Sequence, residues 1–412
     1  MLRRSDFQRV MSVALLAGAL TACIDDETLL PPEPAAGGMF SRYVAIGNSI
    51  TAGFQSGGIN ETTQLQSYVA LLAEGMGHTI GETFRIPLMN NPGCPPLYAD
   101  IFTQARTDTI PNDCALRKEA EPFLNNVAVP GAAVIDVFTN FDAASNPNPL
   151  TTFILGGRSQ VEAAREVQPT FVTVWIGNND VLGAILDTSA FAGSQLITDT
   201  TTFASRYGAM MDSLDAIGTI QGGVLVGVVQ VTGAPYVSRG GAYFLAATQI
   251  PTLTVDLNCL DAVPLTATDT AFVMVPFHYG APLLSAAAAG VPTTLDCSDG
   301  HVISALETAS MMGTVEAYNR VISAEAAERD WVYVDPNALL LTLAADTSAI
   351  RPFPAFPPDP ASATTPFGSA LSLDGIHPSA ATHVTIANAL VQAINAAYKT
   401  NISPATSIVA GN

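Results

Sequence analysis

A serine, a histidine and a nearby aspartate are the residue types with which this chain could carry out nucleophilic catalysis. Ser49 lies within residues 47–53 (GNSITAG), and Asp374 precedes His377 by three positions within residues 374–378 (DGIHP). A serine hydroxyl is a weak nucleophile unless a base lies beside it. An aspartate three residues before a histidine, on a turn that a proline closes, can fix the tautomer and orientation of the imidazole. The pattern favours a serine activated by His377, although the Asp-x-x-His spacing also occurs by chance.

Two further motifs contain groups that could stabilise a developing negative charge. Gly131, within residues 130–132 (PGA), would let its backbone N–H approach a ligand closely, because glycine has no Cβ. Asn179, within residues 177–180 (GNND), could donate a hydrogen bond from its side chain. Both motifs also have the composition of ordinary turns. Acyl transfer through a tetrahedral intermediate needs preorganised donors of this kind.

Alternating strands and helices would bring the four motifs together. Near-continuous apolar runs are typical of parallel strands buried on both faces, and they occupy residues 43–46, 126–129, 171–176, 224–231 and 331–334. Helical patterns occupy residues 67–76, 159–167, 202–217, 305–329 and 379–398. This alternation predicts an α/β fold, a doubly wound sandwich with about five parallel strands. Three motifs follow the first three strands and the fourth precedes the last helix, so all four would meet at the carboxyl ends of the strands.

Three segments do not fit the alternation and are interpreted as insertions, at about residues 90–123, 236–304 and 345–368. Loops at the rim of an open α/β sheet often border the ligand site. The insertions are therefore candidate walls of a substrate cleft, or else surface elaborations without function. Phe353, Phe356 and Phe367 in the third insertion would suit an acyl-binding wall or, equally, local packing.

The N-terminus has the features of an export signal. Arg3, Arg4 and Arg9 precede the uncharged residues 10–22, a stretch too short to span a bilayer. Residues 20–23 (LTAC) resemble the lipobox of bacterial lipoproteins, in which the cysteine, here Cys23, receives the lipid. We therefore expect a signal peptide at residues 1–22, a polar tether at 23–40 and a lipid anchor in the bacterial cell envelope. An ordinary secretory signal with a chance cysteine is the alternative.

The remaining cysteines are even in number, as expected for disulfides in an exported protein. The simplest pairing joins Cys94 to Cys114 and Cys259 to Cys297, although four cysteines allow three pairings. None has a Cys-x-x-Cys spacing and none lies beside a pair of histidines. A metal site is therefore not expected.

Composition excludes several classes of protein. Of the 412 residues 48% are hydrophobic and 13% are charged, which excludes an intrinsically disordered chain. The formal net charge is −20, whereas nucleic-acid binding needs clustered lysine and arginine. Nucleic acid is not an expected partner.

Taken in order, the four motifs resemble those of the SGNH (GDSL-type) hydrolase superfamily. Residues 47–50 match its first block, Gly131 its second, residues 177–180 its third, and Asp374 with His377 its last. The resemblance covers residues 41–400 and leaves 401–412 as a tail. It implies a flavodoxin-like three-layer sandwich. One departure is Asn48, where the family usually has aspartate.

The resemblance also implies roles for individual residues. Ser49 would be the nucleophile, His377 the general base and then acid, and Asp374 the group that orients His377. The backbone N–H groups of Ser49 and Gly131 and the side chain of Asn179 would form the oxyanion hole, with no metal or cofactor. The expected activity is that of a serine esterase that forms an acyl-enzyme on a small-molecule, lipid or glycan ester, in a lipase-like reaction. The alternatives are a polysaccharide O-acetylesterase and a non-catalytic surface-binding lipoprotein.

Overall fold

A computed structural model describes residues 37–110, 114–118, 121–139, 149–187, 189, 196–267, 269–355 and 364–406. The signal peptide predicted at residues 1–22, the lipidation site Cys23 and nearly all of the tether at 23–40 lie outside these ranges. So do Phe356 and the second half of the tail at 401–412. Within the described ranges, no helix combines the length and the apolar character needed to cross a bilayer.

A parallel sheet of four strands forms the centre of the molecule, in the order β1 (Tyr43–Gly47), β4 (Phe171–Trp175), β5 (Gly222–Val226) and β12 (Val332–Val334). The register pairs Tyr43 with Phe171 and Phe171 with Gly222. Every residue of β1, β4 and β5 is buried, as the apolar composition of these strands requires. The predicted α/β class with a parallel sheet is confirmed.

The second predicted strand, residues 126–129, is reduced to a single bridge between Asn126 and Ala45 at the free edge of β1. Val127 N–H donates to Ala45 O at 3.0 Å and Val129 N–H to Gly47 O at 3.1 Å, so the segment still follows β1. Gly47 N–H, which would continue the ladder, donates instead to the Gln160 side-chain Oε1 at 2.9 Å. The sheet therefore has four strands, rather than about five.

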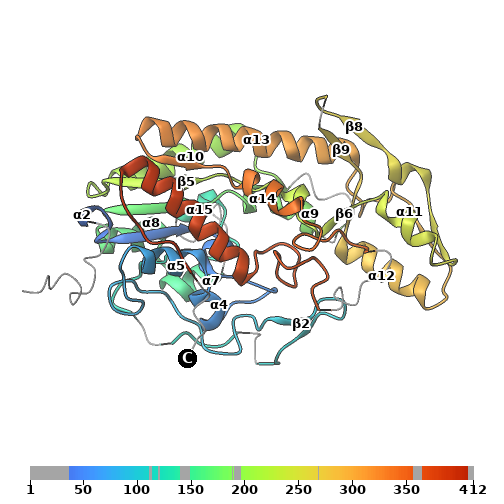
Figure 1. The fold of residues 1–412 in the computed structure, drawn as a ribbon, viewed down its shortest axis with the longest axis horizontal. Helices are drawn as coiled ribbons and strands as arrows, with labels where there is room; N and C mark the ends of the chain where they lie inside the picture. Colours follow the sequence, from blue (N-terminus) through green and yellow to red (C-terminus); the bar gives the residue numbers. More distant parts are fainter. Residues whose placement is uncertain are drawn as a thin grey trace, which may run out of the picture.

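Helices cover both faces of the sheet and produce three layers (Figure 1). Val172 and Val174 of β4 pack among α8, α10 and α13, whereas Phe171 and Trp175 pack on the side of α5 and α15. The bounds of these five helices are Gln160–Val167 (α8), Thr200–Asp215 (α10), Ala305–Glu328 (α13), Tyr68–Gly75 (α5) and Ala380–Tyr398 (α15). All five coincide with predicted helices within a few residues. Serine side chains cap four of them, at Ser159, Ser304, Ser67 and Ser379.

The other described elements are short. The helices are α2 (Gly37–Phe40), α3 (Ser49–Ala52), α4 (Glu61–Leu65), α6 (Val134–Phe138), α7 (Pro149–Leu155), α9 (Asn179–Leu186), η4 (Val231–Gly233), α11 (Ala242–Ala247), η5 (Leu257–Leu260), α12 (Phe277–Ala288) and α14 (Pro336–Ala344). The strands are β2 (Tyr98–Asp100), β3 (Ala105–Arg106), β6 (Val237–Arg239), β7 (Leu253–Val255), β8 (Ala262–Pro264), β9 (Thr270–Phe272), β10 (Met274–Pro276) and β11 (Thr293–Leu295).

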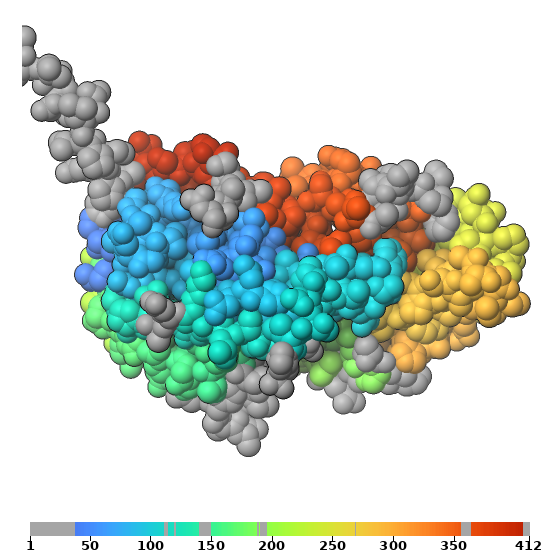
Figure 2. Space-filling model, turned by 90° about the horizontal axis from the view of Figure 1, so that it is seen from below, coloured from blue at the N-terminus to red at the C-terminus, as the bar shows by residue number. Residues whose placement is uncertain are grey.

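Residues 236–304 form a lobe with an apolar cluster of its own, which includes Tyr243, Val275 and Leu295. In Figure 2 this lobe, coloured yellow and gold, lies at one end of the molecule beside the cyan segment that contains β2 and β3. A disulfide joins Cys259 to Cys297 inside the lobe. The second disulfide joins Cys94 to Cys114, so the simplest of the three possible pairings is the one observed.

Phe353 and Phe367 pack against the lobe rather than against Ser49. Their rings lie 4.9 Å and 5.2 Å from the ring of Phe277, measured between centroids. Both side chains are buried in the apolar cluster of the lobe. Of the two predicted roles, local packing is therefore the correct one for these two residues.

Candidate active site

Ser49 lies at the carboxyl end of β1, where the strand turns directly into α3. The Asn48 side chain caps this helix by accepting Ile50 N–H at 3.1 Å. A Cβ on Gly47 would lie 2.2 Å from Thr51 Oγ1 and 2.7 Å from Trp175 O, so only glycine fits there. The turn thus fixes Ser49 at the rim of the sheet, where 8% of its surface is exposed.

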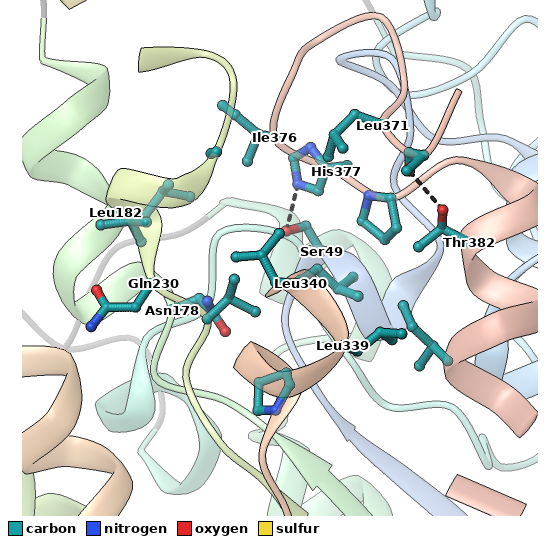
Figure 3. A pocket seen from close by; sticks show the side chains of 18 of the residues that line it. Ser49, Asn178, Leu182, Gln230, Leu339, Leu340, Leu371, Ile376, His377 and Thr382 are labelled. Atoms are coloured by element: carbon teal, nitrogen blue, oxygen red, sulfur yellow. Dashed lines mark hydrogen bonds between the residues drawn. The ribbon is translucent and has the colours of Figure 1, made fainter. Parts of the chain in front are cut away.

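His377 connects Ser49 to Asp374 although 328 positions separate the serine from the histidine. The distance from His377 Nε2 to Ser49 Oγ is 2.8 Å (Figure 3). The distance from His377 Nδ1 to Asp374 Oδ2 is also 2.8 Å. An ionised carboxylate can only accept, so Nδ1 carries the proton and Nε2 is free to accept from the serine hydroxyl. The three residues therefore form a continuous hydrogen-bond chain.

Asp374 is buried and surrounded by donors. Oδ1 accepts the backbone N–H of Ile376 at 3.0 Å and of His377 at 2.9 Å, and Oδ2 accepts Gly57 N–H at 2.7 Å. Burial alone would raise the pKa of Asp374, but the charge and hydrogen bonds of His377 and the N–H of Ile376 outweigh it. They hold the pKa at about 2. The carboxylate is therefore ionised at neutral pH.

A loop six to eight residues after the nucleophile braces the Asp374 turn. Ser56 N–H donates to Ser372 Oγ at 2.7 Å, and Ser56 Oγ accepts Leu373 N–H at 3.1 Å. Ser372 Oγ in turn donates to Asp374 Oδ1 at 3.2 Å. Sequence analysis did not single out Ser56, Gly57 or Ser372, because small residues in turns carry no signal of a partner more than 300 positions away.

Two of the three predicted oxyanion donors, Gly131 and Asn179, come from segments that are joined by a hydrogen bond at Ala132. Asn179 is the first residue of α9, and its side-chain Nδ2 donates one hydrogen to Ala132 O at 2.8 Å. The second Nδ2 hydrogen remains for a ligand. Gly131 adopts a φ of +81°, a left-handed conformation that favours glycine. Asn179 lines the same cavity as Ser49 and His377, whereas Gly131 does not border it.

Asp180, the neighbour of Asn179, fixes α9 in place. Its Oδ2 accepts Val134 N–H at 2.9 Å and its Oδ1 accepts the Thr198 hydroxyl at 3.0 Å. Burial raises its pKa to about 6, although these hydrogen bonds oppose the shift. Asp180 therefore positions the donor-bearing turn of α9. Over the described part of the chain, no three His, Cys, Asp or Glu side chains are grouped so that they could hold a metal ion.

An apolar cavity of about 100 Å³ adjoins Ser49 and His377 (Figure 3). One wall is α14, which contributes Leu339, Leu340 and Leu343. The rest of the lining is also largely aliphatic and includes Leu182, Ile350, Leu371 and Ile376. Sequence analysis did not identify α14, although Asp335 as N-cap and Pro336 at the first helical position are visible signals of a helix start.

Comparisons with known proteins give only weak similarities. No protein-family profile matches the chain, and no curated protein matches it. Among solved structures, an acetylxylan esterase from Geobacillus stearothermophilus is 16% identical, with a TM-score of 0.37 over 88% of this chain and 96% of that one. An alpha/beta hydrolase from the metagenome of Lake Arreo, Spain, is also 16% identical, with a TM-score of 0.37 over 88% and 97%. TM-scores this low do not assign an activity to this chain.

Proposed function

We propose that this chain is a serine esterase that hydrolyses carboxylic esters through an acyl-enzyme. The observation that carries the proposal is the hydrogen-bond chain from Ser49 through His377 to the ionised Asp374, with both distances at 2.8 Å. A serine next to an imidazole that a buried carboxylate orients is the arrangement that makes a hydroxyl nucleophilic. This intact chain of contacts supports an enzyme over a non-catalytic binding lipoprotein.

In the first step, Ser49 Oγ attacks the ester carbonyl carbon while His377 Nε2 takes the hydroxyl proton. Asp374 stays ionised and stabilises the imidazolium that forms. The carbonyl oxygen becomes an oxyanion, which accepts hydrogen bonds from the N–H groups of Ser49 and Gly131 and from Asn179 Nδ2. Loss of one such donor typically lowers turnover about 10²–10³-fold.

The intermediate then collapses to the acyl-enzyme. His377 returns the proton to the oxygen of the leaving alcohol, and the carbon–oxygen bond to the alcohol breaks. A water molecule that His377 deprotonates next attacks the acyl carbon. Ser49 leaves with the proton from His377, and the carboxylic acid is released. Each step uses only groups of the chain and water.

The predicted anchor gives this reaction a place in the cell. With Cys23 lipidated after removal of residues 1–22, the enzyme acts at the bacterial cell envelope, on an ester in a lipid, a glycan or a small molecule. The sequence of residues 20–23 (LTAC) is the support for this part of the proposal.

The test is Ser49→Ala in the mature protein, assayed with p-nitrophenyl esters and with a fluorophosphonate probe. We expect kcat to fall by about 10⁴-fold or more and labelling to be lost, because the nucleophile is gone. Ser213→Ala on α10, where the hydroxyl donates only to Ala209 O, is the matched control and is expected to retain both. Turnover by a folded Ser49→Ala protein, with folding checked by circular dichroism, would refute the proposal.

A further inference from the structure

On the basis of the proposed function, we propose that the cavity beside Ser49 binds the acyl chain of the substrate. The substrates are then esters of aliphatic acids of about four to six carbons, rather than acetate esters. The walls, the position and the size of the cavity each support this assignment.

The cavity begins at the reacting atoms. Ser49, His377 and Asn179 all line it, so a group attached to Ser49 Oγ enters it directly. In an ester hydrolysis the acyl group becomes bonded to the serine in the first step and stays there until water releases it in the second, whereas the alcohol departs to solvent after the first. An apolar cavity that adjoins Oγ therefore suits the acyl side of the ester better than the alcohol side.

The walls are suited to carbon chains rather than to sugar hydroxyls. The side chains of Leu339, Leu340 and Leu343 face the cavity from α14. Besides Ser49, His377 and Asn179, the polar side chains that border it are Asn48, Trp175, Asn178, Gln230 and Thr382. Asn48 Nδ2, Trp175 Nε1, Asn178 Oδ1 and Gln230 Oε1 have no hydrogen-bond partner, but neighbouring atoms cover each of them. A sugar hydroxyl would therefore find few accessible partners here, and an unpaired hydroxyl in such a site is unfavourable.

The volume sets the chain length. An apolar cavity of ~150 Å³ in another protein holds benzene, which has six carbons. A cavity of about 100 Å³ therefore holds about four carbons beyond the carbonyl. An acetyl group would leave most of the apolar surface uncovered, and chains much longer than six carbons would extend out of the cavity without further gain.

The helix that forms this wall offers a matched pair of positions. Leu340 faces the cavity and lies beside Ser49 in Figure 3, whereas the next residue, Leu341, has 73% of its surface exposed. A large side chain at position 340 fills the cavity, and the same side chain at position 341 projects into solvent.

The experiment measures kcat/KM for p-nitrophenyl esters from acetate to decanoate. Each methylene buried in an apolar site favours binding about fourfold. We therefore expect wild-type kcat/KM to rise about tenfold or more from acetate to butyrate and to level off near hexanoate. Leu340→Trp should lower kcat/KM for hexanoate at least about tenfold more than for acetate. Leu341→Trp should keep the wild-type profile. Leu343→Ala, which enlarges the cavity, should move the optimum to longer chains.

Each other outcome has a definite meaning. A wild-type profile that is flat or highest for acetate would overturn the inference, whether or not the variants fold. Alkyl acetates whose kcat/KM rises with the length of the alcohol would assign the cavity to the alcohol and overturn it as well. Absence of hydrolysis for every ester, together with no fluorophosphonate labelling, would instead refute the proposed function.

Discussion

Two regions of this molecule contain an aspartate hydrogen-bonded to a histidine, and they differ in what surrounds the pair. At the rim of the sheet, Asp374 and His377 expose 8% and 11% of their side chains, and Ser49 lies 2.8 Å from the second imidazole nitrogen. In the lobe, Asp299 Oδ1 lies 2.6 Å from His301 Nδ1, but these side chains are 39% and 36% exposed. An aspartate two or three residues before a histidine thus pairs with it readily.

The two Asp–His pairs differ in the contacts that each imidazole makes away from its aspartate. The ring of His301 stacks on Tyr279, with centroids 5.2 Å apart and an angle of 8° between the planes. No hydroxyl of the described residues is hydrogen-bonded to His301 Nε2. His377 instead meets a hydroxyl that arrives from the first strand of the sheet. The local Asp–His spacing is enough to form the hydrogen-bonded pair. The long-range topology of the sheet is what places a serine hydroxyl beside one of the two imidazoles.

The largest effect on activity is expected when the same substitution, aspartate to asparagine, is made in each of the two pairs. Asp374→Asn removes the charge that fixes the tautomer of His377 and stabilises the imidazolium, so kcat should fall about 10⁴-fold. Asp299→Asn makes the same change in the exposed pair of the lobe, and kcat should stay within about twofold. Both are measured with butyrate esters at pH 7. Equal losses in the two variants would mean that the lobe pair takes part in the reaction.

His383 extends the comparison to a histidine with no carboxylate partner. It is fully buried, its Nδ1 accepts Tyr68 N–H at 3.2 Å, and burial together with the charge of His377 lowers its pKa to about 3. Between pH 6.5 and pH 3 the unfolded chain therefore binds the proton and the folded chain does not. The free energy of unfolding should fall by about 1.4 kcal/mol per pH unit on acidification through this window.

His383→Asn keeps an acceptor near the position of Nδ1 and cannot titrate. We expect lower stability than wild type at pH 7, because the smaller side chain leaves a cavity. We also expect a slope of unfolding free energy against pH, between pH 6.5 and 4, that is smaller by about 1 kcal/mol per unit. Urea unfolding at a series of pH values measures the slope, and an unchanged slope would contradict this account of His383.

The smallest effect on activity is expected when the hydrogen bonds between Ser56, Ser372 and Asp374 are removed. Ser372→Ala removes a hydroxyl that donates to the Asp374 carboxylate and accepts from Ser56 N–H. Unfolding free energy should fall by about 1–2 kcal/mol, and kcat should fall less than tenfold. Ser369→Ala is the matched control, since that exposed hydroxyl donates only to Ser348 O, and it should cost less than about 0.5 kcal/mol. A Ser372→Ala protein as stable as the control would show that the brace contributes nothing.

The sequence predicts those parts of the structure that depend on local pattern. Apolar runs and turn residues predict the class of fold and the five helices that cover the sheet. They also predict that Ser49 and His377 lie at the ends of elements. The meeting of Ser49, Asp374 and His377 was expected because the carboxyl ends of parallel strands share one rim.

The features that sequence analysis missed depend on contacts between distant segments. The Gln160 side chain accepts Gly47 N–H, the donor that would continue the ladder to the predicted second strand, and no apolar run reveals this contact. Likewise, α14 becomes a cavity wall only because it packs across from Leu182 and Leu371. Phe353 and Phe367 are aromatic, as an acyl-binding wall would allow, but both are buried in the apolar cluster of the lobe instead.

The separation of 328 positions between Ser49 and His377 has a consequence for the biosynthesis of the protein. The segment that carries the hydroxyl leaves the ribosome before the segment that supplies the imidazole and its carboxylate. Until residues 374–377 have been made and α15 has docked against α5, Ser49 Oγ has no imidazole within hydrogen-bond distance. The hydrogen-bond chain from Ser49 through His377 to Asp374 therefore cannot form before these residues are made, and truncation upstream of residue 374 removes it.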